Sequence, residues 1–323
     1  MTPLHFENLY RAEWEELEKL LATLRGSRKE RRTMPGERLA ALYRRTCEHL
    51  ALSRARTYPA YLVDKLEHLT SEAHQAIYQE REFGWQRLYA FAARDFPKAV
   101  RAHAVYVWIA TAVFVIPTLI VGALVYLRPE LILSVVDSQT AAEFERMYSG
   151  ADEAIGRRRD ADTDWMMFGY YIRHNIGLAF QCFASGLVAG IGSLFFLAFN
   201  GAFFGALAGY LTERGLSETF YSFVVTHAAF ELTAIVLAGA AGLRIGHSLL
   251  APGRLTRKQA LVAAAREAVV IVYGVALMLL IAAAVEAFWS SSRWVPPVIK
   301  YAVAGVCWTS VLGYLTLQGR RAG

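Results

Sequence analysis

The sequence contains little cysteine, little charge and no common catalytic signature. Its 323 residues include only three cysteines, Cys47, Cys182 and Cys307, and their spacing predicts neither a disulfide framework nor a zinc site. A Walker motif, a Rossmann fingerprint and a GxSxG elbow are missing, so the sequence does not support a nucleotide-dependent or acyl-transfer enzyme. The N-terminal region is polar and amphipathic, and we expect no signal peptide there.

Long apolar runs replace these signatures. Hydrophobic residues make up 55% of the chain, and several runs of about 20 apolar residues are long enough to cross a hydrocarbon core. We therefore predict an all-α fold, a polytopic membrane helical bundle with about six transmembrane helices and an N-terminal cytoplasmic helical domain. The transmembrane domain is predicted at 102–318, with spans at 103–127, 168–190, 193–212, 221–246, 268–289 and 298–317. A second register remains open, in which the second span ends at Phe199 and 201–212 forms a half-helix.

The first hundred residues have a different pattern. Apolar residues recur at helical spacing in three segments of residues 1–101, which predicts a small cytoplasmic helical module. This module is either a plain folding unit or a docking surface for a cytoplasmic partner.

At 85–101, aromatic and apolar residues such as Trp85 and Phe96 share one face, and basic residues share the other. That pattern predicts an amphipathic helix at the membrane interface.

The distribution of charge predicts the orientation. Residues 1–101 hold 18 basic and 14 acidic residues, and the 247–266 loop and the C-terminal tail are also basic. Residues 128–172 hold nine acidic residues and five arginines. By the positive-inside rule, both termini are predicted to be cytoplasmic, with 128–167 as an external loop. This loop is either a partner site or an ordinary connector.

A few polar residues interrupt the apolar runs. His227 and Glu231 are four residues apart and share one face of a predicted helix, while Asn175 and Asn200 lie in neighbouring spans. We predict a buried polar cluster of these four residues. An HxxxE pair can be a buried structural pair, a transport switch or part of a metal site. Because Ala228 follows the histidine, the HExxH signature is absent. We expect no catalytic residue, no metal ligand and no cofactor.

Glycines recur at intervals that allow close contact between helix backbones. The predicted helix-packing glycines are Gly186, Gly190, Gly201, Gly205, Gly209, Gly239 and Gly242. Their faces can pack within one chain or between copies in a homo-oligomer, and the sequence leaves both open.

The central stretch resembles the stage II sporulation protein M family of bacterial integral membrane proteins. The resemblance rests on Asn175, on the glycines from Gly186 to Gly192, and on two segments, FNGAFFGALAG (199–209) and THAAFELTAIVLAGAAGLRIG (226–246). The family often has a glycine after the histidine and a proline after the glutamate–leucine pair, where this chain has Ala228 and Thr233. Neither difference displaces the polar pair. The resemblance covers 170–317 well and implies a multi-pass protein of the bacterial inner membrane.

The resemblance also implies a function. The namesake is similar to a membrane anchor that assembles with two peptidoglycan-degrading partners, and some homologues with long N-termini are encoded near MoxR-type ATPases. We therefore expect a non-enzymatic scaffold or recruitment protein of a cell-envelope complex. Its expected contacts are membrane lipid, a cytoplasmic partner at 1–101 and envelope partners at 128–167, but not nucleic acid. The alternatives are a transporter, channel or lipid-handling protein that uses Asn200, His227 and Glu231, and a membrane-embedded metalloenzyme.

Overall fold

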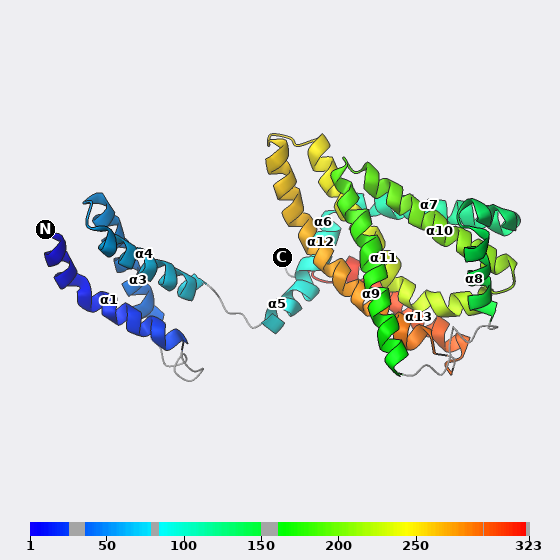
Figure 1. The fold of residues 1–323 in the computed structure, drawn as a ribbon, viewed down its shortest axis with the longest axis horizontal. Coiled ribbons are helices and arrows are strands. Elements are labelled where there is room, and N and C mark those ends of the chain that lie inside the picture. The colour runs from blue at the N-terminus through cyan, green and yellow to red at the C-terminus, as the bar shows by residue number, and fades with distance from the viewer. Residues whose placement is uncertain (26–35, 79–83, 150–160, 293, 321–323) are drawn as a thin grey trace. The chain divides into compact units, whose positions relative to one another are not determined.

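The computed structural model describes residues 1–25, 36–78, 84–149, 161–292 and 294–320 (Figure 1). Throughout these ranges every regular element is a helix, as predicted. The chain divides into two compact units, which we call the N-terminal unit (1–87) and the membrane unit (88–323). Each unit is described by itself.

The predicted N-terminal helices are present as α1 (Pro3–Arg25), α3 (Gly36–Ala55) and α4 (Ala60–Tyr78). Their apolar faces form a core around Trp14, whose side chain is fully buried. The Trp14 Nε1–H donates a hydrogen bond of 3.2 Å to Nδ1 of His49 on α3. Burial lowers the pKa of His49, and a neutral imidazole can accept this bond.

The membrane unit contains five helices that are long and apolar enough to cross a membrane within the described residues. They are α7 (Ala104–Leu127), α10 (Ile191–Glu213), α11 (Ser217–Leu250), α12 with its continuation η4 (Arg257–Ala284 and Val285–Ser290), and α13 (Pro297–Leu317). The chain is therefore a multi-pass membrane protein. Helix α11 is the central element, because it contacts the other four as well as α9 (Ala161–Ala184) (Figure 1).

Helix α9 corresponds to the second predicted span, 168–190, and it is not among these five. It nevertheless runs the length of the bundle. Near its start, the rings of Trp165 and Phe168 lie 5.2 and 5.7 Å from the ring of Phe288 in η4. Beyond its last residue, Gly186 in η3 (Ser185–Leu187) packs against the backbone of Gly242 in α11. The polar residues of α9 lower its hydropathy, and the helix packs within the bundle against α11 and α12.

The bundle has two distinct ends. We call one the α8 end, where η2 (Pro129–Ser134) and α8 (Ser138–Ser149) cover the bundle and Tyr148 contacts the ring of Phe220. The other is the α6 end, named after α6 (Phe96–Ala102). There the Arg101 guanidinium donates to the Leu315 carbonyl at 3.0 Å. The chain thus enters and leaves the bundle at the same end.

Several boundaries differ from the predicted ones. The break between α9 and α10, which correspond to the second and third predicted spans, lies at 185–190 rather than 190–193. Asn200 is therefore inside a continuous α10, and the half-helix register is not adopted. Helix α12 begins at Arg257, which reduces the predicted 247–266 loop to 251–256. A capping box between Thr256 and Gln259 starts this helix. Within the predicted external loop, 150–160 lies outside the described residues.

The predicted interfacial helix at 85–101 is distorted and divided between the two units. It consists of α5 (Gly84–Ala90), the π-helical η1 (Phe91–Asp95) and α6. Trp85 and Tyr89 are exposed, whereas the Phe96 ring packs against Gly274 of α12. The segment from 88 onward therefore belongs to the membrane unit.

Candidate functional site

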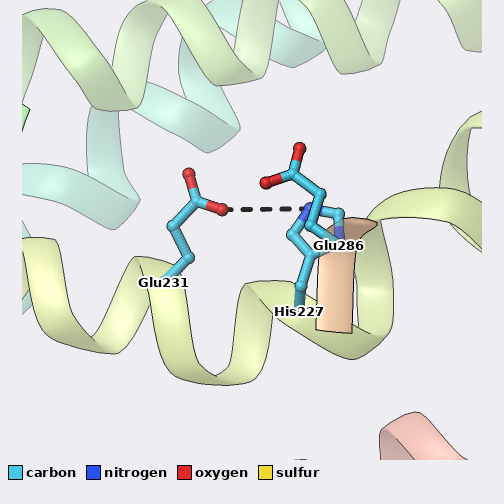
Figure 2. A group of neighbouring side chains, drawn as sticks. All are labelled: His227, Glu231 and Glu286. Atoms are coloured by element: carbon cyan, nitrogen blue, oxygen red, sulfur yellow. Dashed lines mark ion pairs between the residues drawn. The ribbon is translucent and has the colours of Figure 1, made fainter. Parts of the chain in front are cut away.

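The site is a buried cluster of one imidazole and two carboxyl groups. His227 and Glu231 lie one turn apart on α11, and Glu286 faces them from η4 (Figure 2). One potential ligand atom from each of the three residues lies within 4.8 Å of the others. Figure 2 shows that the carboxyl groups of Glu231 and Glu286 turn toward one another beside the imidazole ring.

The orientation of the His227 ring is fixed on both sides. Its Nδ1 lies 3.0 Å from the Ser290 hydroxyl, and the Phe223 ring meets it edge-on with centroids 5.3 Å apart. On its other edge, Nε2 is 3.9 Å from the nearer carboxylate oxygen of Glu231. This distance exceeds that of a hydrogen bond. Nε2 therefore faces the two carboxyl groups without being hydrogen-bonded to Glu231.

Glu286 is buried, and its Oε2 has no hydrogen-bond partner in the described part of the chain. Asn175 of α9 is only 1% exposed, and its amide lies beside the Glu286 carboxyl group. Unsatisfied buried polar atoms are rare in native proteins and often mark a site for a ligand or water. The local π-helix places Glu286 in this position, and π-turns within helices are frequent at functional sites.

A cavity lies at the α8 end of the bundle, near the cluster. It has a volume of about 340 Å³ and is lined by polar groups that include Glu218, Ser290 and Lys300. Lys300 is buried, and its Nζ donates a 2.8 Å hydrogen bond to the Ser290 carbonyl. His227, Glu231 and Glu286 do not line the cavity, but its lining residue Ser290 contacts the His227 imidazole.

The structure assembles only part of the predicted polar cluster. Asn175, His227 and Glu231 belong to it, but Asn200 makes its contacts elsewhere. The Asn200 amide donates a 2.7 Å hydrogen bond to the Phe196 carbonyl of its own helix and lies 4.0 Å from the Cys182 sulfur. It lies on α10, which contributes none of the cluster's other side chains. A carboxamide in a membrane helix often satisfies its donors on the backbone, as here.

The predicted packing glycines lie where helix backbones meet. A Cβ at Gly201, Gly205 or Gly209 of α10 would collide with backbone atoms of α7, at Phe114, Thr118 and Gly122 respectively. Similar collisions would occur at Gly186 against Gly242, while Gly239 lies against the Leu197 side chain. Gly190 has φ +83° at the break before α10. These faces are used within one chain, so they do not themselves indicate a homo-oligomer.

Sequence reasoning missed Glu286, Ser290 and Lys300 as members of the site. Glu286 and Lys300 are ionisable residues inside or at the start of long apolar helices, and such residues are costly in a membrane unless they have a role. This signal was available in the sequence. The sequence did not show the position of these residues relative to His227, because η4 and α13 contact α11 only in the tertiary structure.

The cluster has two chemical possibilities. An imidazole and two carboxylates can hold a metal cation, or they can share protons among themselves. Both need the groups close together and away from bulk water, as they are here.

Comparison with known protein families gives two matches. The model of the family described as stage II sporulation protein M matches residues 103–291, which include His227, Glu231 and Glu286. A second model, described as a domain of unknown function (DUF8413), matches residues 5–79. A search of curated proteins and a search of solved structures found no match. Since the first match covers well over half of the 323 residues, the chain belongs to the stage II sporulation protein M family.

Proposed function

We propose that this protein is a non-enzymatic scaffold of the bacterial inner membrane that recruits partners to a cell-envelope complex. The observation that carries the proposal is the N-terminal unit. It has its own core, and a separate domain family matches it from residue 5 to residue 79. A folded module joined to a membrane bundle suits a protein that holds a soluble partner at a membrane.

The surface of the N-terminal unit is suited to protein contacts. Charged pairs join its helices at the surface, such as Arg38 of α3 with Glu16 of α1 at 2.6 Å. Exposed pairs add little stability, so these charges are available for partner recognition at small cost to folding. A cavity of about 330 Å³ between α1 and α4 is bordered by Glu18, Lys65 and Glu72. The partner proposed for this unit is a cytoplasmic protein, such as a MoxR-type ATPase.

Contacts within the bundle support a placement of both chain ends on the same side of the membrane. Residues 101 and 315 meet at the α6 end, where Arg244 of α11 forms a 2.9 Å ion pair with Glu267. Basic residues follow the C-terminal end of α11, with Arg254 in the loop and Arg257 and Lys258 in the first turn of α12. Positive-inside placement then puts the α6 end and both termini in the cytoplasm. The α8 end faces the envelope side, and the described part of the external loop is available there for envelope partners.

Affinity purification from membranes tests the proposal. The full chain, solubilised in mild detergent, is compared with a chain that lacks residues 1–78 and with a full-length Glu286→Gln variant. We expect a cytoplasmic partner to copurify with the full chain and with the Glu286→Gln variant, and to be lost with the truncated chain. Copurification of the same proteins with all three, or of no specific protein with any, would contradict the recruitment role.

The cavity favours transport as a second candidate function. Ser290 and Lys300 line it, and Ser290 contacts His227. Buried ionisable groups beside a polar cavity are typical of proton and ion pathways. This candidate uses Glu231 and His227 but not Asn200, whose hydrogen bond is made within α10.

Proteoliposomes that contain a pH-sensitive dye test this candidate. The full chain is expected to speed the decay of a proton gradient, and Glu231→Gln is expected to reduce that rate because a carboxamide cannot carry the proton. Glu267→Gln serves as a control, because Glu267 lies at the α6 end and pairs with Arg244. Equal rates for liposomes with and without the protein would exclude proton transport.

A further inference from the structure

His227, Glu231 and Glu286 have the donor set and spacing of a metal site. The three ligand atoms lie within 4.8 Å of one another, and Nε2 of His227 is 3.9 Å from Glu231 Oε2. Ligands bound to a common cation at about 2.1 Å lie roughly 3.0–3.5 Å apart. Each side chain needs to move by less than about 1 Å to reach that spacing. We propose that these three residues bind a divalent transition-metal cation.

The charges around the cluster leave a place for a cation. Among the described residues, no lysine or arginine forms an ion pair with Glu231 or Glu286. Lys300, the nearest such group in the cavity, donates instead to the Ser290 carbonyl. Two carboxylates close together in a low-dielectric interior repel each other, and a divalent cation between them would remove that repulsion.

The surroundings of His227 support the ligand role. The Ser290 hydroxyl at 3.0 Å can accept a hydrogen from Nδ1, which leaves the Nε2 lone pair directed at the carboxyl groups. Metal-binding histidines commonly have such a partner on the other ring nitrogen, which fixes the tautomer and the ring orientation. The Phe223 ring closes the apolar side of the imidazole.

Glu286 and the cavity supply two further observations. The Glu286 Oε2 has no hydrogen-bond partner within the described ranges, and the Glu286 carboxyl group faces Glu231 and His227 (Figure 2). Asn175 lies beside Glu286, and exchanging its amide nitrogen and oxygen would offer a fourth oxygen there. The cavity of about 340 Å³ is lined by Ser290, which contacts His227, so polar groups lie between the α8 end and the cluster.

The ligands also limit the kind of metal. One imidazole nitrogen with two carboxylate oxygens suits Zn²⁺ or Mn²⁺, whereas a thiolate-free site does not select Cu⁺. The imidazole makes Mg²⁺ and Ca²⁺ poorer candidates, because both prefer oxygen ligands throughout. Since α11 and η4 both contribute ligands, the cation would join the central helix to the end of α12.

Metal titration of the full chain in detergent tests the proposal. Protein stripped with a chelator is titrated with Zn²⁺ alone and with Mn²⁺ alone, and bound metal is measured by elemental analysis after desalting. We expect one cation per chain. Glu286→Gln and His227→Gln are expected to weaken binding by about tenfold or more, because even second-shell changes at metal sites typically cost about 10–100-fold. Glu267→Gln, which removes a carboxyl group from α12 outside the cluster, is expected to leave binding unchanged.

Thermal unfolding separates loss of binding from loss of folding. Without metal, Glu286→Gln is expected to unfold at the same temperature as the original chain or higher, because it removes a buried carboxyl group without changing its shape. Added Zn²⁺ or Mn²⁺ is expected to raise the unfolding temperature of the original chain only. Absence of stoichiometric binding by the original chain, or equal binding by Glu286→Gln, would overturn the proposal and leave a proton-sharing cluster.

Discussion

Replacing Gly205 with valine is expected to prevent the membrane unit from folding stably. A Cβ at this position would collide with the carbonyl oxygen, Cα and carbonyl carbon of Thr118 in α7. The obstacle is a helix backbone, which cannot move aside as a flexible side chain does. Overpacking a well-packed site typically costs about 1–3 kcal/mol, and we expect about 3 kcal/mol or more here.

The effect follows from the way α7 and α10 meet. Gly201, Gly205 and Gly209 form one face of α10, and all three lie against the backbone of α7. The Thr118 hydroxyl also donates to the Gly201 carbonyl at 3.0 Å, a contact that needs this close approach. A single valine would therefore separate the two helices along their length.

Fluorescence-detected gel filtration of a fusion protein, followed by thermal unfolding, measures the effect. Gly313→Val on α13 is the matched control, because a Cβ there meets no atom within 4 Å. Both variants carry the same change in intrinsic helix propensity, so the difference between them isolates packing. Equal yields and unfolding temperatures for the two variants would show that α7 and α10 do not pack as described.

Replacing Trp14 with alanine is expected to unfold the N-terminal unit and to leave the membrane unit intact. The Trp14 side chain is fully buried among Phe6, Leu17 and their neighbours, and its indole N–H bonds to His49. Tryptophan-to-alanine changes in cores cost about 3–5 kcal/mol. Since domains have about 5–15 kcal/mol of stability in total, this loss is large for a unit of three helices.

Hydrogen exchange measured by mass spectrometry on the full chain resolves the two units. In Trp14→Ala we expect peptides from α1, α3 and α4 to lose protection, while peptides from α10 and α11 keep theirs. Leu9→Ala is the control, because Leu9 lies on the same helix and is 52% exposed. If α10 and α11 also lost protection, the two units would fold as one cooperative structure.

The Trp14→Ala variant also tests the proposed recruitment role of the N-terminal unit. If the N-terminal unit recruits a partner, Trp14→Ala should lose that partner as the truncated chain does. Leu9→Ala should retain it, because substitutions at exposed sites away from special features change stability by roughly 0.5 kcal/mol or less.

Apolar runs and helical periodicity were sufficient to predict most of the fold. Five of the six predicted spans correspond to apolar helices, and the N-terminal helices are present as expected. The lengths of the predicted spans were less accurate. Helix α11 continues from 217 to 250, beyond the predicted 221–246, because polar residues at its ends remain compatible with a helix outside the hydrocarbon region.

Helix α9 is not among the five helices apolar enough to cross a membrane, although the sequence predicted a span there at 168–190. Arg173, His174 and Asn175 lower its mean hydropathy, but Asn175 is buried beside Glu286. A hydropathy value summed over the residues of a helix treats each side chain as if it faced lipid. Only the positions of neighbouring helices show that this polar residue faces protein instead.

The sequence by itself determined a helical membrane protein with a separate helical N-terminal unit, because segment length and periodicity are local properties of the chain. It also identified the His227–Glu231 pair, since residues four apart on a helix share a face. The tertiary structure alone brought Glu286 to this pair and to the predicted Asn175, left Asn200 out, and turned the glycine faces inward. Those outcomes depend on the rotation and register of packed helices, which contacts distant in sequence determine and local patterns do not.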